Sequence, residues 1–217
     1  MISITSQIPR TSSWEDIVNF DSLASGDIIA ITLKDGTNLD LEVAHDEKGK
    51  QFIVFRDCLP KSRAMNRTNT NVGGWRDSDM RKYAGEVFEL LPDDLQAIIV
   101  PTKIVQVING ARIECADKLF CLSYTQVFGA NRRCDEPEDS QMDIYKRRRN
   151  RAKEFVGQSE SWCSWWLRSP HTDYTTYFYN VYLEGCDYYS NASYSHGVCF
   201  GFCIQSENLN SEEEAAT

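Results

Sequence analysis

The chain has no apolar run close to the roughly 20 residues that a membrane-spanning helix requires. The motifs of P-loop proteins, of serine hydrolases (G-x-S-x-G), of zinc proteases (H-E-x-x-H) and of dinucleotide-binding enzymes (G-x-G-x-x-G) are also absent. The start, MISITSQIPRTSSW, has neither the basic nor the apolar region of a secretory signal peptide. We therefore expect that the protein is made in the cytoplasm and does not insert directly into a membrane. We also expect that it is not an enzyme.

Basic residues are fewer than acidic ones. There are 23 Lys and Arg against 32 Asp and Glu, a net charge of −9, which argues against nucleic acid as a partner. Of the 217 residues, 41% are hydrophobic and 25% charged, a composition typical of one globular domain. We expect an N-terminal lead-in at 1–20, one domain at 21–205 and a disordered acidic tail at 206–217.

The sequence has no C-x-x-C pair, although it contains eight cysteines. Without a secretory signal we expect reduced thiols that behave as small buried apolar groups, and neither a metal nor a cofactor. In a strand, Cys199 and Cys203 would lie on one face, directed inward. A zinc site built from His196, Cys199 and Cys203, with Cys186 nearby, is the alternative interpretation.

Alternating apolar residues predict short strands, some joined by hairpin turns such as Asn109-Gly110. The expected strands cover 27–33, 38–43, 51–58, 103–108, 112–115, 118–122, 177–183 and 198–204. A helix should begin at Asp77 or Ser78, which suit an N-cap, and stop at Pro92, and the Asp pair at 93–94 can cap a second, short helix. Strands, two helices and then many short strands indicate an α+β fold.

Residues 135–154 hold six acidic and six basic side chains. A Lys/Arg-rich run of this kind can bind nucleic acid. The carboxylates around it instead favour a solvated helix or loop whose charges compensate one another.

Seven of the ten tyrosines fall between Tyr174 and Tyr194, and no Lys or Arg follows Arg168. From 171 to 196 the sequence is dominated by Tyr, Ser, Thr, Asn, Asp and His. Antibody combining sites use the same mixture, because Tyr offers a large rigid contact area and small polar residues offer adaptable hydrogen bonds. The composition predicts a ligand-binding surface. A half-exposed sheet, which also favours Tyr and Thr, is the alternative.

Four ordered segments resemble those of an uncharacterised domain family of gut bacteria and their phages: GWRDSDMR at 74–81, KLFCLS at 118–123, WWLRSP at 165–170 and GVCFGFCI at 197–204. The similarity spans residues 20–205. The layout also resembles the C-type-lectin-like fold, and some proteins of that fold are variable proteins of diversity-generating retroelements, in which a reverse transcriptase mutates adenines near the 3′ end of the gene. The resemblance implies a lectin-like domain with a variable, ligand-facing segment at about 171–196. It also implies incorporation into a phage virion, or display on a cell surface by a non-standard route.

The amino-acid composition of this segment fits such diversification. Randomising the adenines of AAC or AAT codons leaves a pyrimidine in the third position, and such codons cannot encode Lys, Glu, Gln, Met or Trp. These five types make up 41 of the 217 residues, so simple proportion predicts about five among residues 171–196. Only Glu184 is present.

We place the ligand contacts in this segment, at Asp173, Tyr174, Thr175, Thr176, Tyr177, Tyr179, Asn180, Tyr182, Asp187, Tyr188, Tyr189, Ser190, Asn191, Tyr194, Ser195 and His196. The scaffold beneath it is assigned to Trp165, Trp166, Leu167 and Arg168, because a Trp pair in an apolar strand is usually buried. We expect Arg168 to pair with a carboxylate or with carbonyl groups under the binding face. No catalytic residue and no metal ligand is predicted.

The sequence thus predicts a receptor-like or adhesin-like protein that recognises an unidentified protein or surface ligand, and it makes no prediction of oligomeric state. The carbohydrate-binding tripeptides Glu-Pro-Asn and Gln-Pro-Asp are absent, so sugar binding and calcium ligation are not expected. Two alternatives stay open. One is a structural phage or cell-surface component without diversification, and the other is an enzyme on a lectin-like scaffold, which a deep pocket with convergent polar groups would favour.

Overall fold

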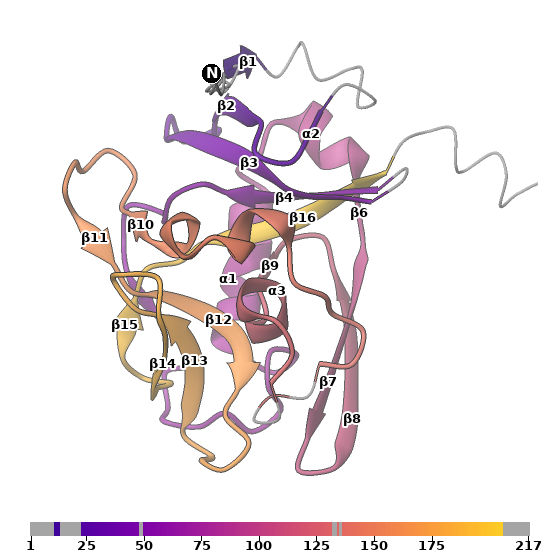
Figure 1. The fold of residues 1–217 in the computed structure, drawn as a ribbon, viewed down its shortest axis with the longest axis vertical. Helices are drawn as coiled ribbons and strands as arrows, with labels where there is room; N and C mark the ends of the chain where they lie inside the picture. Colours follow the sequence, from indigo (N-terminus) through magenta and orange to yellow (C-terminus); the bar gives the residue numbers. More distant parts are fainter. Residues whose placement is uncertain (1–10, 14–22, 48–49, 132–133, 135, 206–217) are drawn as a thin grey trace, which may run out of the picture.

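A computed structural model describes residues 11–13, 23–47, 50–131, 134 and 136–205. The predicted tail at 206–217 lies outside the described residues, as does most of the predicted lead-in at 1–20. The chain forms an α+β fold around a seven-stranded main sheet (Figure 1). Its strands run in the order β1 (Thr11–Ser13), β2 (Ile28–Thr32), β3 (Asn38–Glu47), β4 (Lys50–Phe55), β16 (Phe200–Gln205) and β6 (Ile99–Val100), with β9 (Phe120–Cys121) also paired to β16.

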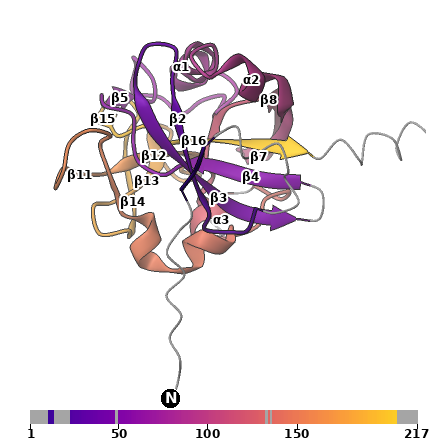
Figure 2. The same cartoon turned by 90° about the horizontal axis from the view of Figure 1, so that it is seen from above.

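The pairs of the main sheet are antiparallel, except for β1 with β2. Seen from above, β3, β4 and β16 lie side by side (Figure 2). The strand closest to the C-terminus therefore pairs with one from the N-terminal part of the chain. The predicted strands at 27–33, 38–43, 51–58 and 198–204 are confirmed in position, with ends shifted by up to four residues.

Several smaller sheets accompany the main one. A three-stranded antiparallel sheet, which lies below the main one in the view of Figure 1, runs in the order β12 (Trp165–Pro170), β13 (Tyr177–Val181) and β14 (Asp187–Asn191). The two-stranded sheets are β7 (Thr102–Ile108) with β8 (Ala111–Asp117), β10 (Lys153–Glu154) with β11 (Trp162–Cys163), and β5 (Arg63–Ala64) with β15 (Ser195–His196). Asn109 and Gly110 both have positive φ, 52° and 77°, as a two-residue hairpin turn requires, so the predicted β7–β8 hairpin is confirmed.

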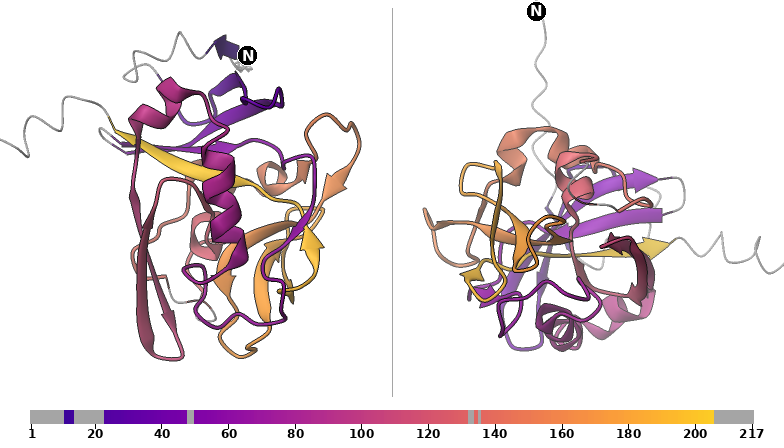
Figure 3. Two further views of the ribbon diagram at one scale, coloured as in Figure 1. Left: turned by 180° about the vertical axis from the view of Figure 1, so that it is seen from behind. Right: turned by 90° about the horizontal axis from the view of Figure 1, so that it is seen from below.

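The helices are α1 (Asp79–Phe88), α2 (Asp93–Ile98) and α3 (Tyr124–Phe128), followed by the 3₁₀ turns η3 (Asp143–Lys146) and η4 (Arg148–Arg151). The predicted cap of α1 is confirmed, because the Ser78 hydroxyl accepts a hydrogen bond of 3.1 Å from the backbone N–H of Arg81. The Tyr83 ring of α1 lies 6.1 Å from the ring of Phe200 at the start of β16, and the back view shows α1 crossing that strand (Figure 3). Within the described residues, no helix is long and apolar enough to cross a membrane.

The segment at 135–154 differs from the predicted solvated helix or loop. It forms the two 3₁₀ turns, but Glu136 and Lys153 are only 5% and 1% exposed. Each has partners that make burial tolerable. The ammonium of Lys153 donates to the carbonyls of Phe55 and Arg56 at 2.9 and 2.5 Å, and the partners of Glu136 are described below.

All eight cysteines are thiols rather than disulfides, and Cys199 and Cys203 are fully buried as predicted. Burial raises the pKa of Cys199 to about 11, which keeps the thiol protonated. In the part of the chain that the structure describes, no cluster of His, Cys, Asp and Glu side chains could hold a metal ion. The alternative zinc ligands His196, Cys186, Cys199 and Cys203 are thus not brought together.

Candidate ligand-binding surface

The three-stranded sheet positions most of the predicted contacts. β13 is its central strand, with Trp166 opposite Asn180 on one side and Tyr189 opposite Tyr179 on the other. β14 is an edge strand, so the side chains of its two consecutive tyrosines are less enclosed than those of β13. The Tyr-rich stretch therefore divides into a buried central strand and an exposed edge.

Five tyrosine rings form one continuous group at the surface, called here the tyrosine patch: Tyr174, Tyr177, Tyr182, Tyr188 and Tyr189, of which Tyr177 is half-buried. Tyr174, Tyr182 and Tyr188 are 50%, 48% and 56% exposed. The rings of Tyr188 and Tyr189 stack at 5.5 Å, and Tyr182 lies 5.8 Å from Tyr188. Tyr177 lies 5.3 Å from Tyr189 and 5.4 Å from Tyr174. Contiguous exposed aromatic area of this kind marks interaction sites.

A second layer of rings lies under the patch. His171 and Tyr179, which are 4% and 2% exposed, stack at 5.2 Å with 11° between their planes. Tyr189 contacts the His171 ring at 4.9 Å, and Tyr124 of α3 contacts the Tyr179 ring at 4.8 Å. The patch therefore rests on buried aromatic groups, which restrict the ring positions before any ligand binds.

Two of the predicted contacts are wrong. Tyr179 is buried between Tyr124 and His171, and Asn180 is fully buried, where its amide donates to the Ser190 hydroxyl at 2.8 Å. The two side chains point to opposite faces of β13, and both are covered in this central strand. These side chains can support the surface but cannot touch a ligand.

The other predicted contacts are at least partly exposed. Asp173, Thr175, Asp187 and Ser195 are exposed, and Thr176, Ser190 and Asn191 are half-buried. Tyr194 is 58% exposed but, within the described residues, makes no ring contact with the patch. His196 is half-buried, with its ring 4.5 Å from that of Trp166, and burial lowers its pKa.

The loop at 66–74 contributes a residue that sequence reasoning missed. Asn71 is 3% exposed, and its amide nitrogen lies 3.1, 2.8 and 2.8 Å from the carbonyl oxygens of His171, Tyr174 and Tyr177. Its backbone N–H donates to the carbonyl of Thr175 at 2.7 Å. One side chain from a distant loop thus fixes the loop that carries Tyr174. The only sequence signal is the Gly73-Gly74 pair, which is typical of a tight turn. In the structure both glycines have positive φ, and the turn follows Asn71.

The predicted scaffold residues Trp165, Trp166, Leu167 and Arg168 are no more than 1% exposed. Both indole N–H groups are satisfied, since Trp165 donates to the carbonyl of Arg151 and Trp166 to that of Arg63, each at 2.8 Å. Buried indoles need such partners.

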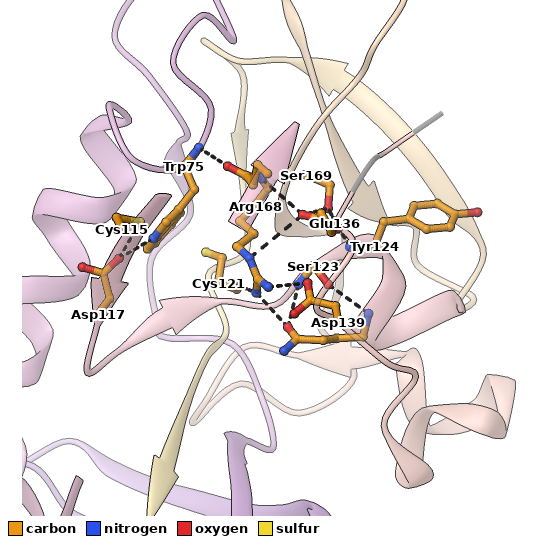
Figure 4. Close-up of polar contacts among 12 residues, drawn as sticks. Trp75, Cys115, Asp117, Cys121, Ser123, Tyr124, Glu136, Asp139, Arg168 and Ser169 are labelled. Atoms are coloured by element: carbon orange, nitrogen blue, oxygen red, sulfur yellow. Dashed lines mark hydrogen bonds and ion pairs between the residues drawn. The ribbon is translucent and has the colours of Figure 1, made fainter. Parts of the chain in front are cut away.

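Arg168 has the carboxylate and carbonyl partners expected from the sequence (Figure 4). Its guanidinium donates to Asp139 at 2.5 Å, to the side-chain oxygen of Gln126 at 2.7 Å and to the carbonyl of Cys121 at 2.9 Å. Its Nε lies 4.0 Å from Glu136. The guanidinium thereby ties β12 to α3, β9 and the segment before η3.

Glu136 occupies the other side of this network. Its carboxylate accepts from the Ser169 hydroxyl at 2.7 Å and from the Gln106 amide at 3.2 Å. Burial raises the pKa of Glu136 to about 7, against the attraction of Arg168 and with added repulsion from Asp139. Two carboxylates thus share one guanidinium, in a network whose Arg168 and Glu136 side chains are both 1% exposed.

A hollow in the structure lies away from the tyrosine patch. It has a volume of about 600 Å³, runs along α1, and no patch residue lines it. Two of its basic groups are in ion pairs, Arg81 with Asp117 at 2.9 Å and Lys82 with Asp79 at 2.9 Å.

Residues 48–206 match the model of a domain family described as a domain of unknown function, DUF6273. No curated protein and no solved structure matches the chain.

Proposed function

We propose that this chain, which belongs to the DUF6273 family, is a binding protein that recognises a protein or surface ligand through the tyrosine patch and catalyses no reaction. The observation that carries the proposal is the exposure of Tyr174, Tyr182 and Tyr188, each close to half or more, on a base of buried rings. Tyrosines are prominent among the residues that dominate binding energy at interfaces. Because the rings are held before binding, less conformational entropy is lost on contact.

The proposal includes a C-type-lectin-like fold. Two features support it. The Trp- and Arg-containing strand β12 leads directly into the hairpin that carries the patch, and the chain then returns to the main sheet as β16 beside β4. A place in a phage virion or on a cell surface belongs to the same proposal.

Diversification of the segment at 171–196 by a retroelement is also proposed. Its support is the composition of the segment together with the position of Glu184, which pyrimidine-ending codons cannot encode. The carbonyl and the carboxylate of Glu184 accept hydrogen bonds from the guanidinium of Arg148, at 3.0 and 3.1 Å. A residue held by the scaffold is one that diversification would be expected to spare.

The genome tests the diversification. We expect a near-copy of the codons for about 163–204, differing almost only at adenines and adjacent to a reverse transcriptase gene. The differences should fall at codons for exposed residues such as Tyr174 and Tyr188, and spare the fully buried Phe178, Val181 and Ala192. Absence of such a copy would overturn diversification and leave a fixed binding domain.

Selection of ligands tests the binding surface. A display library of random dodecapeptides, selected on the wild-type protein, should enrich peptides that no longer bind the triple variant Tyr174→Ser, Tyr188→Ser, Tyr189→Ser. The control is Trp162→Ser, which removes an aromatic residue 54% exposed outside the patch and should retain the peptides. Enriched peptides that bind the triple variant as well as the wild type would refute the patch as the binding site. A drop in melting temperature of the triple variant without loss of peptide binding would favour the structural role.

A further inference from the structure

The loop at 67–72 lies along the variable segment at two places. At one end, Asn71 binds the carbonyls of His171, Tyr174 and Tyr177. At the other, the amide of Asn69 donates to the side-chain oxygen of Asn191 at 2.9 Å, and the backbone N–H of Asn66 donates to the carbonyl of Ala192 at 3.0 Å. The loop therefore follows the surface from the Tyr174 loop to the end of β14.

The outer side of this loop is exposed and partly apolar. Val72 is 66% exposed, more than any tyrosine of the patch. Arg67, Thr68 and Asn69 are also exposed. The neighbour of Val72, Asn71, hydrogen-bonds to the residue that follows Tyr174. An exposed apolar residue thus follows directly the residue that holds the Tyr174 loop, in a segment that the proposed diversification does not reach.

We propose that the loop at 67–72 is a second, invariant part of the ligand-binding surface, and that Asn71 is the positioning residue that holds the Tyr174 loop against it. This proposal rests on the proposed function. The partner it fits is a folded protein. Exposed tyrosine rings together with an apolar residue, Val72, and a basic one, Arg67, match the composition typical of protein interfaces.

The role of Asn71 follows from its chemistry. Its amide nitrogen has two N–H groups and faces three carbonyl oxygens, two of them part-buried with it. Asn71→Asp keeps the shape but replaces these donors by a carboxylate that repels the carbonyls. The Tyr174 loop then loses the contacts that close it, while α1 and the main sheet keep theirs.

Amide hydrogen exchange on the ligand-free protein tests the positioning role. In Asn71→Asp we expect exchange of the amides at 172–177 to speed up by about tenfold or more, as the loss of a buried donor set predicts. Amides of β3, β4 and β16 should exchange as in the wild type. Asn69→Asp, a matched change in the same loop at an exposed side chain, should leave 172–177 unchanged. Unaltered exchange at 172–177 in Asn71→Asp, or equal acceleration across the main sheet, would overturn the positioning role.

The peptides selected on the wild-type protein test the second part of the surface. Val72→Ser should weaken those peptides that depend on Tyr188 by about tenfold, roughly the loss expected for one well-packed interface side chain. Trp162→Ser should leave them unaffected. Peptides that lose binding in the tyrosine triple variant but not in Val72→Ser would overturn this inference while leaving the proposed function intact. Peptides insensitive to the triple variant would overturn the proposed function itself.

Discussion

The substitution Glu136→Gln should stabilise the protein above neutral pH and leave its stability nearly unchanged in mild acid. Burial raises the pKa of Glu136 to about 7, with Arg168 opposing the rise and Asp139 adding to it. A glutamine amide has nearly the shape of a protonated carboxyl group. Its oxygen can still accept from the Ser169 hydroxyl and the Gln106 amide. The variant therefore mimics the protonated form of the network at every pH.

The proton on Glu136 makes the stability of the folded chain depend on pH. Between pH 4.5 and about 7, the folded chain keeps a proton on this group that the unfolded chain has lost. The stability that this proton adds to the folded chain is therefore fully present below pH 4.5, and it is lost as the pH rises through about 7. At 1.36 kcal/mol per pKa unit, the difference between 4.5 and about 7 corresponds to about 3 kcal/mol. Near pH 8, the free energy of unfolding of Glu136→Gln should exceed that of the wild type by up to about this amount.

Urea unfolding, followed by tryptophan fluorescence from about pH 4.5 to about pH 8, measures the effect. Subtracting the two stability curves removes contributions common to both proteins, such as that of His196, whose lowered pKa reduces stability in acid. Glu138→Gln is the matched control. The exposed Glu138 carboxylate accepts from Arg112, which lowers its pKa, so its loss should slightly destabilise the protein by nearly the same amount throughout this pH range. A stability difference for Glu136→Gln that does not change with pH would refute the reasoning.

Three further substitutions test the packing beneath the surface by urea unfolding. Gly197→Ala should cost about 1–3 kcal/mol, because a Cβ there would lie 2.8 Å from the sulfurs of Cys58 and Cys163; an unchanged midpoint would show that the sulfurs move aside freely. Ser123→Ala should cost about 1 kcal/mol, since its hydroxyl caps α3, and a smaller loss would mean that the short helix needs no cap. Arg168→Met should cost about 3–5 kcal/mol because it leaves buried carboxylates without their cation, and a variant as stable as the wild type would contradict the assigned network.

Much of the fold is predictable from local sequence because its signals are local. Ser78 caps α1, the pair Asn109-Gly110 turns the β7–β8 hairpin, and the aspartates at 93–94 begin α2. The exposure of the tyrosine patch was equally predictable, because its exposed members lie on the two loops that flank β13 and on the edge strand β14, within one Tyr-rich stretch. Each of these features depends on residues within a few positions of one another.

The failures concern contacts between distant segments. Tyr179 is buried because α3 brings Tyr124 against it from 55 positions away. Asn71 holds the Tyr174 loop from about 100 positions away. Glu136 is buried because Ser169, 33 positions later, supplies its partner. Composition marked the residues around Glu136 as solvated, and no local pattern shows which charged side chain in such a run has an interior partner.

The burial pattern of the segment at 171–196 sets a limit on the proposed diversification. Phe178, Val181 and Ala192 are fully buried, and a random polar replacement at such a site typically costs several kcal/mol, a large part of the 5–15 kcal/mol that stabilises a domain. A mechanism that acts only on adenines can avoid this cost, because Phe, Val and Ala are encoded without adenine in the first two codon positions. Tyr, Asn, Asp and His each require adenine in the second. The genetic code would thus direct mutation to the exposed tyrosines and away from most of the buried residues beneath them. Tyr179 and Asn180, which are buried but have adenine in their codons, are the positions at which variation would destabilise the fold.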